Sequence, residues 1–317
     1  MDITDTFDFS DTNSVHTTKN YRSGYVAIIG RPNVGKSTLL NFILGQHLSI
    51  TSKKPQTTRH RLLGIKTTSS AQAVYIDTPG LHQNQKGAIH RYMNREAITT
   101  LQDVDVIVFV VDRLKITPED EYAMELLEKC TQPIILAVNK VDKIKNKELL
   151  LPFMDELSQR LKFAHVLPIS ATKGNNIEEL EKHIESHLHL SAAFFPEEQI
   201  TDKSDRFLAA ELIREKIMRL LGQEVPYAVA VEVEAFEEES EIIKISAIIW
   251  VERANQKGII IGHKGQQLKE IGKQARLSME HLYAKKVFVK LWVKVKDGWS
   301  DDERALKSLG YSDEFQS

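Results

Sequence analysis

The stretch GRPNVGKS at residues 30–37 decides the fold, because it matches the phosphate-binding pattern G-x-x-x-x-G-K-[ST]. It follows the apolar run YVAII at residues 25–29 and opens a helical pattern. Its glycines let backbone N–H groups and a helix N-terminus point at phosphate oxygens. In such a loop Lys36 reaches the β- and γ-phosphates and the Ser37 hydroxyl binds Mg²⁺. The expected phosphate-binding residues are Gly30, Arg31, Pro32, Asn33, Val34, Gly35, Lys36, Ser37 and Thr38, with Gly80 from a later loop.

Short apolar runs alternate with helical patterns on both sides of this loop. Nearly all-apolar strands separated by helices predict an α/β domain with a mostly parallel sheet that is covered on both faces. We place this domain at residues 23–190, after a polar segment at residues 1–22 that we expect to be disordered. The strand-like runs are residues 25–29, 73–76, 104–111, 133–138 and 165–169.

A second motif, DTPG at residues 77–80, ends the next internal strand. An aspartate at this position holds Mg²⁺, usually through water, so Asp77 joins Ser37 as a predicted metal ligand. Gly80 can offer its N–H to the γ-phosphate because no side chain stands in the way.

A third motif, NKVD at residues 139–142, follows a later strand and predicts the base. The Asp142 carboxylate can accept hydrogen bonds from two N–H donors on one edge of guanine, and adenine presents no such pair. An ATPase or a nucleotide kinase would explain the phosphate loop alone, but not this motif. The predicted guanine-binding residues are Asn139, Lys140, Asp142, Ser170 and Ala171.

The second half of the chain has a different order of elements. After a linker at residues 191–205, it reads helix, strand, strand, helix, helix, strand over residues 206–297, followed by a tail at residues 298–317. From residue 253 to residue 296 there are eleven Lys or Arg against two acids. A basic face of this kind indicates a nucleic-acid partner, and a solvated lysine-rich surface is the alternative.

The loop GHKG at residues 262–265 lies within this basic stretch, between two short helices. Two glycines let the backbone approach a phosphate chain, and the basic side chains between them add charge. Because a G-x-x-G tetrapeptide is common by chance, the element order and the preceding isoleucine run carry the prediction. An α/β module for protein contacts is the alternative. The predicted RNA-binding residues are Gly262, His263, Lys264 and Gly265.

Taken together, these motifs resemble the Era GTPases. The resemblance rests on residues 30–37, QTTRH at 56–60, DTPGLH at 77–82 and NKVD at 139–142, and continues through LWVKVK at 291–296. It implies a Ras-like GTPase domain followed by a type II, bacterial-type KH domain. It also implies binding to small-subunit ribosomal RNA near its 3′ end during assembly of the small ribosomal subunit, and peripheral association with the inner membrane.

The resemblance further implies that residues 56–60 form a switch loop, in which a threonine closes on Mg²⁺ when the γ-phosphate is present. Thr57 and Thr58 are both candidates, and we expect Thr58. Relatives that share Asn33 use a potassium ion where other GTPases use an arginine, so K⁺ is implied as a second cofactor. Ras-like enzymes carry a water-orienting glutamine after the DTPG glycine, whereas this chain has Leu81, which predicts slow intrinsic hydrolysis.

The composition fits a soluble protein, with 42% hydrophobic and 27% charged residues and a net charge of −2. No apolar run reaches the ~18 residues needed to span a bilayer. The single cysteine, Cys130, suits a reducing compartment, so we expect a cytoplasmic monomer. Two functions remain open from the sequence: a GTP-hydrolysing assembly switch, and an RNA-binding chaperone in which GTP is mainly a structural ligand.

Overall fold

The computed structural model describes residues 20–52, 54, 57–81, 87–222 and 229–309 of the 317-residue chain. Most of the N-terminal segment predicted to be disordered lies outside the described residues. So do Gln56 of the predicted switch motif, His82, and the last residues of the predicted C-terminal tail.

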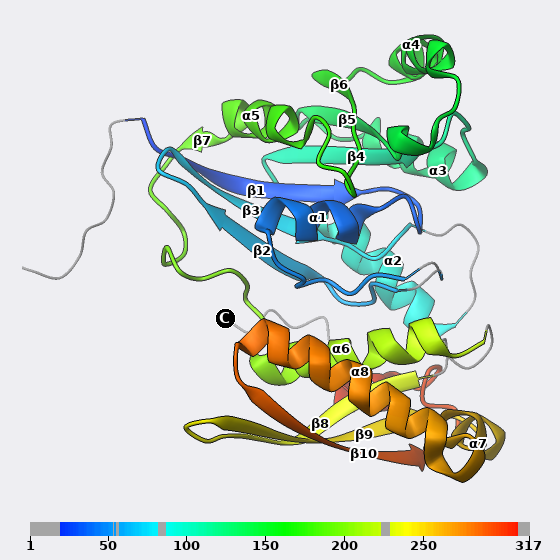
Figure 1. Ribbon diagram of the computed structural model, residues 1–317. Coiled ribbons are helices and arrows are strands. Elements are labelled where there is room, and N and C mark those ends of the chain that lie inside the picture. The colour runs from blue at the N-terminus through cyan, green and yellow to red at the C-terminus, as the bar shows by residue number, and fades with distance from the viewer. Residues whose placement is uncertain (1–19, 53, 55–56, 82–86, 223–228, 310–317) are drawn as a thin grey trace, which may run out of the picture.

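The first domain is built on one twisted sheet with the strand order β2-β3-β1-β4-β5-β6 (Figure 1). Its central strands are parallel, while β2 runs antiparallel to β3 and the short β7 runs antiparallel to β1. The strands are β1 (Arg22–Ile29), β2 (Leu62–Thr67), β3 (Ala71–Asp77), β4 (Val106–Asp112), β5 (Ile134–Asn139), β6 (His165–Pro168) and β7 (His189–Leu190).

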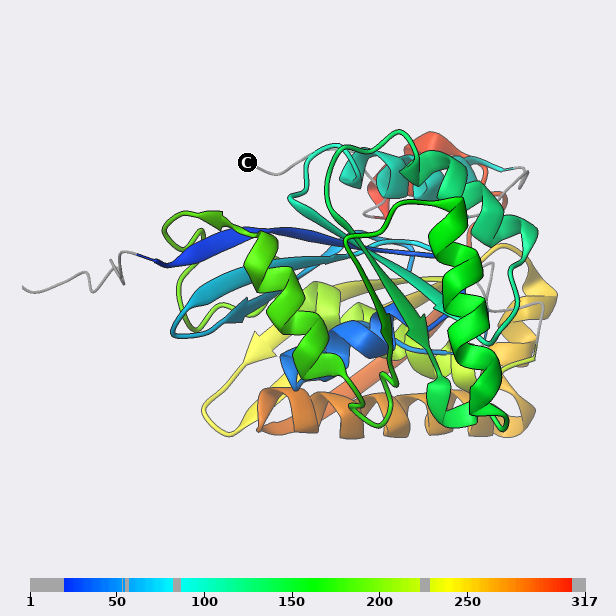
Figure 2. The same cartoon turned by 90° about the horizontal axis from the view of Figure 1, so that it is seen from above.

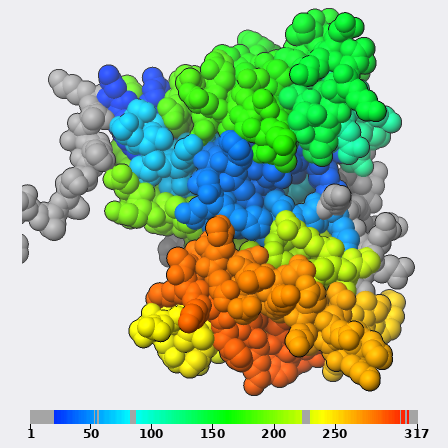
Figure 3. All heavy atoms as spheres, viewed as in Figure 1, coloured from blue at the N-terminus to red at the C-terminus, as the bar shows by residue number. Residues whose placement is uncertain are grey.

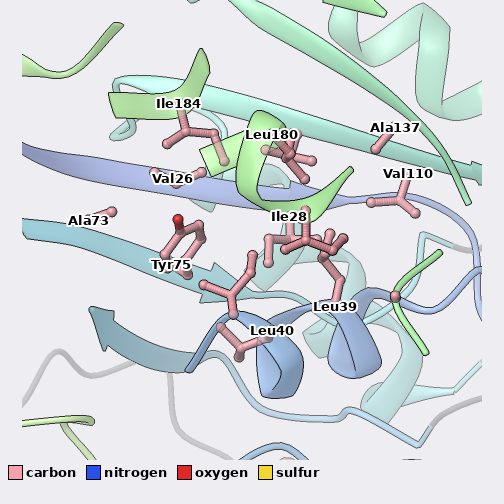
Figure 4. Close-up of a cluster of buried hydrophobic side chains, with 14 of the residues drawn as sticks. Val26, Ile28, Leu39, Leu40, Ala73, Tyr75, Val110, Ala137, Leu180 and Ile184 are labelled. Atoms are coloured by element: carbon pink, nitrogen blue, oxygen red, sulfur yellow. The ribbon is translucent and has the colours of Figure 1, made fainter. Parts of the chain in front are cut away.

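Helices cover both faces of this sheet, because its strands carry apolar residues on both sides. In β1, Val26 and Ile28 belong to the core beneath α1 and α5, whereas Ala27 and Ile29 belong to the core beneath α2, α3 and α4. Figure 4 shows the first of these cores, and Figure 2 shows the layers from above. The helices are α1 (Lys36–Leu44), α2 (Ala88–Thr100), α3 (Pro118–Leu127), α4 (Leu150–Arg160) and α5 (Ile177–His187).

The second domain packs α6, α7 and α8 on one face of a three-stranded sheet with the order β10-β9-β8. Strand β9 is central; it pairs antiparallel with β8 and parallel with β10. The elements are α6 (Asp205–Leu220), β8 (Val229–Glu238), β9 (Ile242–Val251), α7 (Ala254–Ile261), α8 (Gln266–Tyr283), β10 (Lys286–Val295) and α9 (Glu303–Ser308).

The segment between the domains is tied to the first sheet. The Ile65 N–H of β2 donates to the Ile200 carbonyl oxygen at 2.8 Å. The Gln72 side-chain oxygen accepts the N–H groups of Phe194 and Phe195 at 2.7 and 2.9 Å. The Leu63 N–H of β2 also donates to Asp202 Oδ1 at 3.2 Å, so this edge strand, which the sequence analysis did not find, has hydrogen-bond partners on its outer side.

Helix α6 lies between the two domains (Figure 3) and joins them through a buried carboxylate. The Glu215 side chain is fully buried, and its Oε1 accepts from the Thr51 N–H at 3.0 Å and lies 3.0 Å from His47 Nε2. Lys216 Nζ lies 2.6 Å from Oε2, and Arg219 Nη2 lies 2.9 Å from Oε1. Burial alone would raise the pKa of Glu215, but His47, Lys216 and the Thr51 N–H lower it to about 2.

A second contact between the domains involves the C-terminal segment. Trp299 is fully buried, and it shares an apolar cluster with Leu306 of α9, Ala230 of β8, and Tyr92 and Met93 of α2. Residues 299–306 therefore fill the space between α2 and the second sheet. Among the described residues, no helix combines the length and the apolar character needed to cross a bilayer.

We predict that Glu215→Gln lowers the free energy of unfolding at pH 7 by about 3 kcal/mol, because the cationic partners lose a buried charge. The pKa of Glu215 is lowered from 4.5 to about 2. The carboxylate therefore stabilises the fold above pH ~4.5 and loses this effect as the pH falls toward ~2. Denaturant unfolding of parent and variant between pH 7 and pH ~4 measures the difference, which should shrink at the acidic end.

Glu178→Gln is the matched control, because the Glu178 side chain is 85% exposed and pairs only with Lys182 across the surface of α5. Its unfolding curve should match the parent's at every pH. An equally small effect from Glu215→Gln would mean that the buried carboxylate does not hold the domains together.

Candidate functional site

The phosphate loop and parts of the other predicted nucleotide motifs line a cavity of ≈ 1030 Å³ at the carboxyl ends of the parallel strands, where open α/β sheets bind ligands. The phosphate loop and the start of α1 form its floor, and Thr57, Thr58, Gly80 and Lys140 line its sides. Met218 and Arg219 of α6 also line it, so the second domain contributes part of the wall.

The phosphate loop is fixed against the NKVD motif. Asn139 Nδ2 donates to the Val34 carbonyl oxygen at 2.8 Å, and Asn139 Oδ1 accepts from the Ala171 N–H at 3.0 Å. Gly35 has φ 110°, and a Cβ there would lie 2.4 Å from Asn139 Nδ2. Only glycine fits at this position, because both the backbone conformation and the close approach exclude a side chain.

Lys36 is nearly buried beneath the loop. Its Nζ donates to the carbonyl oxygens of Gly30 at 2.9 Å and Arg31 at 3.1 Å. Burial lowers the pKa of Lys36 to about 8, and the nearby Asp77 carboxylate opposes this effect. A phosphate would bring further negative charge and favour the ammonium form.

Four oxygen-bearing side chains converge beside Lys36. Asp77 Oδ2 accepts from the hydroxyls of Ser37 and Ser49 at 2.7 Å each, and from Thr58 at 3.4 Å. The Ser37 and Thr58 hydroxyl oxygens lie 2.9 Å apart. Asp77 Oδ1 is buried and has no hydrogen-bond partner among the described residues. Burial raises the pKa of this carboxyl. A set of hard oxygen donors with an unsatisfied buried carboxylate oxygen fits Mg²⁺.

The two candidate switch threonines point in different directions. Thr58 joins the Asp77 cluster, whereas the Thr57 hydroxyl lies 2.8 Å from Ser52 Oγ and donates to the Lys54 carbonyl oxygen at 2.7 Å. The Thr57 carbonyl oxygen accepts from Arg214 of α6. This geometry favours Thr58 as the threonine beside the metal position.

The sequence analysis did not predict two polar residues of the site. Ser49 lies in a loop that contains no recognisable motif, and the fold brings its hydroxyl to Asp77. Asp112 is the last residue of β4, where a side chain near the ligand could have been suspected. It pairs with Arg31, and its Oδ2 lies 2.6 Å from Lys140 Nζ. Arg31 is therefore turned away from the phosphate position and can contribute only its backbone there.

Asp142, the residue predicted to read the base, is exposed and accepts a hydrogen bond from the Ser170 hydroxyl at 2.7 Å. It lines a smaller cavity of ≈ 260 Å³ rather than the large one. The Ala171 N–H, predicted to meet the guanine oxygen, donates to Asn139 in this structure. The structure thus brings the NKVD motif and residues 170–171 together at one end of the sheet.

Two side chains next to the DTPG and switch motifs are oriented away from the cavity. The Leu81 side chain is fully buried in the core under α2 and α3, so it does not meet a nucleotide. Arg59, which follows Thr58, is also fully buried. Its Nη1 donates to the Val229 carbonyl oxygen of β8 at 2.7 Å.

The predicted RNA-binding loop joins α7 to α8 at the far end of the second domain (Figure 1). Gly262 and Gly265 have φ 69° and 78°, and a Cβ at Gly262 would lie 2.6 Å from Gln267 Cβ. His263 and Lys264 are exposed between them. Gly265 caps the 18-residue helix α8, whose free N–H groups suit an anionic ligand.

Comparison with known proteins identifies the family of each domain. Residues 25–140 match the family model of the 50S ribosome-binding GTPases, and residues 224–300 match the KH domain model. GTPase Era of Pseudomonas aeruginosa is 59% identical over 292 residues, which cover 92% of this chain and 96% of that protein. GTPase Era of Marinobacter nauticus is 57% identical over 292 residues, which cover 92% of this chain and 96% of that protein. The chain belongs to the Era GTPase family.

Solved structures of the Era family share its fold. A variant of Aquifex aeolicus Era bound to GDP and AlF₄⁻ superposes with a TM-score of 0.89 at 40% identity, covering 92% of this chain and 99% of that one. An Era structure with MgGDPNP and nucleotides 1506–1542 of 16S ribosomal RNA matches with the same score, identity and coverage. The predicted Ras-like GTPase domain with a following KH domain is confirmed.

We predict that Asp142→Asn weakens GTP binding by about 1–3 kcal/mol and moves the preference toward xanthosine triphosphate, whose edge offers a carbonyl to the new amide. Equilibrium titration with both nucleotides measures the change. Asp155→Asn, an equivalent change on α4, is the control and should leave both affinities unaltered. Unchanged GTP affinity in the Asp142 variant would remove the base-reading role.

Proposed function

We propose that this chain is a GTP-hydrolysing switch that binds small-subunit ribosomal RNA near its 3′ end and acts in assembly of the small ribosomal subunit. The observation that carries the proposal is that the phosphate loop, both switch threonines, Gly80 and Lys140 line one cavity, whose wall includes α6 of the KH domain. The Era relative that binds a GTP analogue and the 16S ribosomal RNA segment supports the RNA partner.

In this proposal, Ser37, Thr58 and Asp77 hold Mg²⁺, which bridges phosphate oxygens and neutralises their charge when it is bound. Lys36 contacts the β- and γ-phosphates, and the backbone N–H groups of residues 33–38 surround them. Gly80 supplies an N–H beside Pro32, where a Cβ would lie 2.7 Å from the proline ring. Because Leu81 is buried, no side chain at that position orients the attacking water, and intrinsic hydrolysis is slow.

The alternative function, an RNA chaperone with GTP as a structural ligand, gains its support from the same buried Leu81. Multiple-turnover GTP hydrolysis with and without the ribosomal RNA fragment separates the two. The switch requires turnover that RNA stimulates; a single bound GTP that persists in the presence of RNA would favour the chaperone. We also propose that the protein is a cytoplasmic monomer that contacts the membrane peripherally. Sedimentation measures its oligomeric state, and co-sedimentation with lipid vesicles measures its membrane binding.

We predict that RNA binding and GTP hydrolysis can be separated by mutation. Gly265→Asp should abolish RNA binding, because it strains a left-handed backbone position and adds a charge facing phosphate. Lys264→Ala should weaken RNA binding mildly and lower the salt slope by about 0.7. Neither should change GTP turnover without RNA. RNA titrations against salt and GTPase rates on the same preparations provide the test.

Lys36→Ala is the reciprocal variant. It should abolish nucleotide binding and leave the KH domain folded, as near-UV circular dichroism would report. Parent-like RNA affinity in Gly265→Asp would contradict the role of the G-x-x-G loop without affecting the nucleotide assignment.

A second prediction concerns the potassium ion that the family resemblance implies. Asn33 lines the cavity with φ 64°, and its carbonyl oxygen accepts from Lys140. If Asn33 helps to hold K⁺, GTP turnover should be faster in potassium than in sodium at equal ionic strength, and Asn33→Ala should remove the difference. Equal rates of the parent in both salts would contradict the potassium role.

A further inference from the structure

The outer face of the KH sheet, opposite α6 and α8, carries a row of aromatic and basic side chains on β10. Along this strand Val287 and Val293 are buried in the core, with Val289 and Leu291 packed against it. The residues between them alternate to the other side. We call these the outer row: Phe288, Lys290, Trp292 and Lys294.

The two aromatic side chains of the outer row are unusually open to solvent. Phe288 is 54% exposed and Trp292 is 37% exposed. They are four residues apart on one face of a strand, about 13 Å, so each ring can take a separate flat partner. Single exposed apolar residues are common, but two aromatic residues aligned on one strand form an interaction surface.

Lysines stand beside these rings. Lys290 Nζ lies 4.7 Å from the centroid of the Trp292 ring, and Lys294 Nζ lies 5.7 Å from that of Trp250 on β9. Lys290 has no carboxylate partner among the described residues, and the Glu234 oxygen nearest Lys294 is 3.8 Å away. The row therefore offers cations to an anionic ligand, next to aromatic faces.

This combination favours nucleic acid over protein. Flat bases stack on aromatic side chains while basic groups follow the phosphates, which is how single strands and sheet-based RNA readers bind. Lysine is depleted in protein–protein interfaces, whereas here it occupies every second outward position. The acidic residues of the outer face, such as Glu232, lie on β8, so an RNA strand would follow β10.

The position of β10 connects the outer row to the predicted RNA-binding loop. Strand β10 is at the edge of the sheet, and its carboxyl end lies beside α7, which leads into residues 262–265 (Figure 1). RNA leaving the loop can pass over this edge to the outer face, because no further strand lies outside β10 in the described part of the chain.

We propose that the outer row is a second RNA contact, which continues the path of a single strand held at the G-x-x-G loop. Phe288 and Trp292 each stack on a base, and Lys290 and Lys294 contact phosphates. The inference rests on the proposed RNA-binding function and adds a distinct surface to it.

The test uses the full chain and two RNA oligonucleotides with sequence from the 3′ end of 16S ribosomal RNA. One has about four nucleotides, the length that the loop clamps; the other has roughly twelve and can reach the outer row. The double variant Phe288→Ala/Trp292→Ala should lose about tenfold or more in affinity for the long RNA and nothing for the short one. Because both side chains are exposed, the variant should fold, and its GTP turnover should equal the parent's.

Two further variants and two controls sharpen the result. Trp292→Phe keeps an aromatic face and should retain most of the long-RNA affinity while losing the tryptophan quenching that stacking causes. Lys290→Gln should lower the salt slope for the long RNA by about 0.7. Leu151→Ala and Lys162→Gln alter exposed residues of the GTPase domain and are the matched controls, expected to change neither affinity.

Parent-like binding of the long RNA by the double variant would overturn the second contact. So would intact RNA affinity combined with weaker binding to whole small subunits, because the row would then contact protein. A parent chain that binds neither RNA would contradict the proposed function itself. If Gly265→Asp loses affinity for both RNAs and the double variant loses affinity for the long RNA alone, the two contacts are established separately.

Discussion

Burial of one carboxylate organises the nucleotide site. An unpaired ion in a protein interior is costly, so Asp77 requires donors, and it draws them from three separate segments of the chain. Ser37 comes from α1, Ser49 from the loop after it, and Thr58 from the switch loop. One oxygen, Oδ1, is left without a partner among the described residues, and an unsatisfied carboxylate oxygen of this kind is a suitable ligand for a hard cation. The same carboxylate faces Lys36, so phosphate and metal positions share one electrostatic centre.

The segment that carries Thr58 is held from two sides. Its hydroxyl faces Asp77, while the carbonyl of the preceding Thr57 accepts from Arg214 and the following Arg59 reaches the β8 backbone. Glu215 fixes the start of the same loop through Thr51. This loop therefore has several of its hydrogen bonds with the neighbouring domain. The KH domain is part of the environment in which the GTPase site forms.

The sequence could predict those parts of the site that follow from local rules. A glycine-rich loop between strand and helix, and motifs at the ends of buried strands, place Lys36, Asp77 and Asn139 without any coordinates. Ser49 and Asp112 could not be predicted in this way, because their roles arise when distant segments meet. Strand β2 was missed for a related reason: its stability comes from the linker on its outer side. The choice between Thr57 and Thr58 depends on which way two adjacent side chains turn, and no periodicity encodes that.

The burial of Trp299 between the two domains affects how the protein folds during its synthesis. The side of α2 that carries Ile89, Tyr92 and Met93 is covered by residues 299–306, which are made long after α2 and after the rest of the GTPase domain. Domains fold from the N-terminal end as the chain is made. After the GTPase domain ends at residue 190, about a third of the 317-residue chain must be made before residue 299 is reached, and this apolar stripe stays open to solvent until then. A chain that lacks residues 299–306 therefore exposes more apolar surface on its first domain than a chain that contains them.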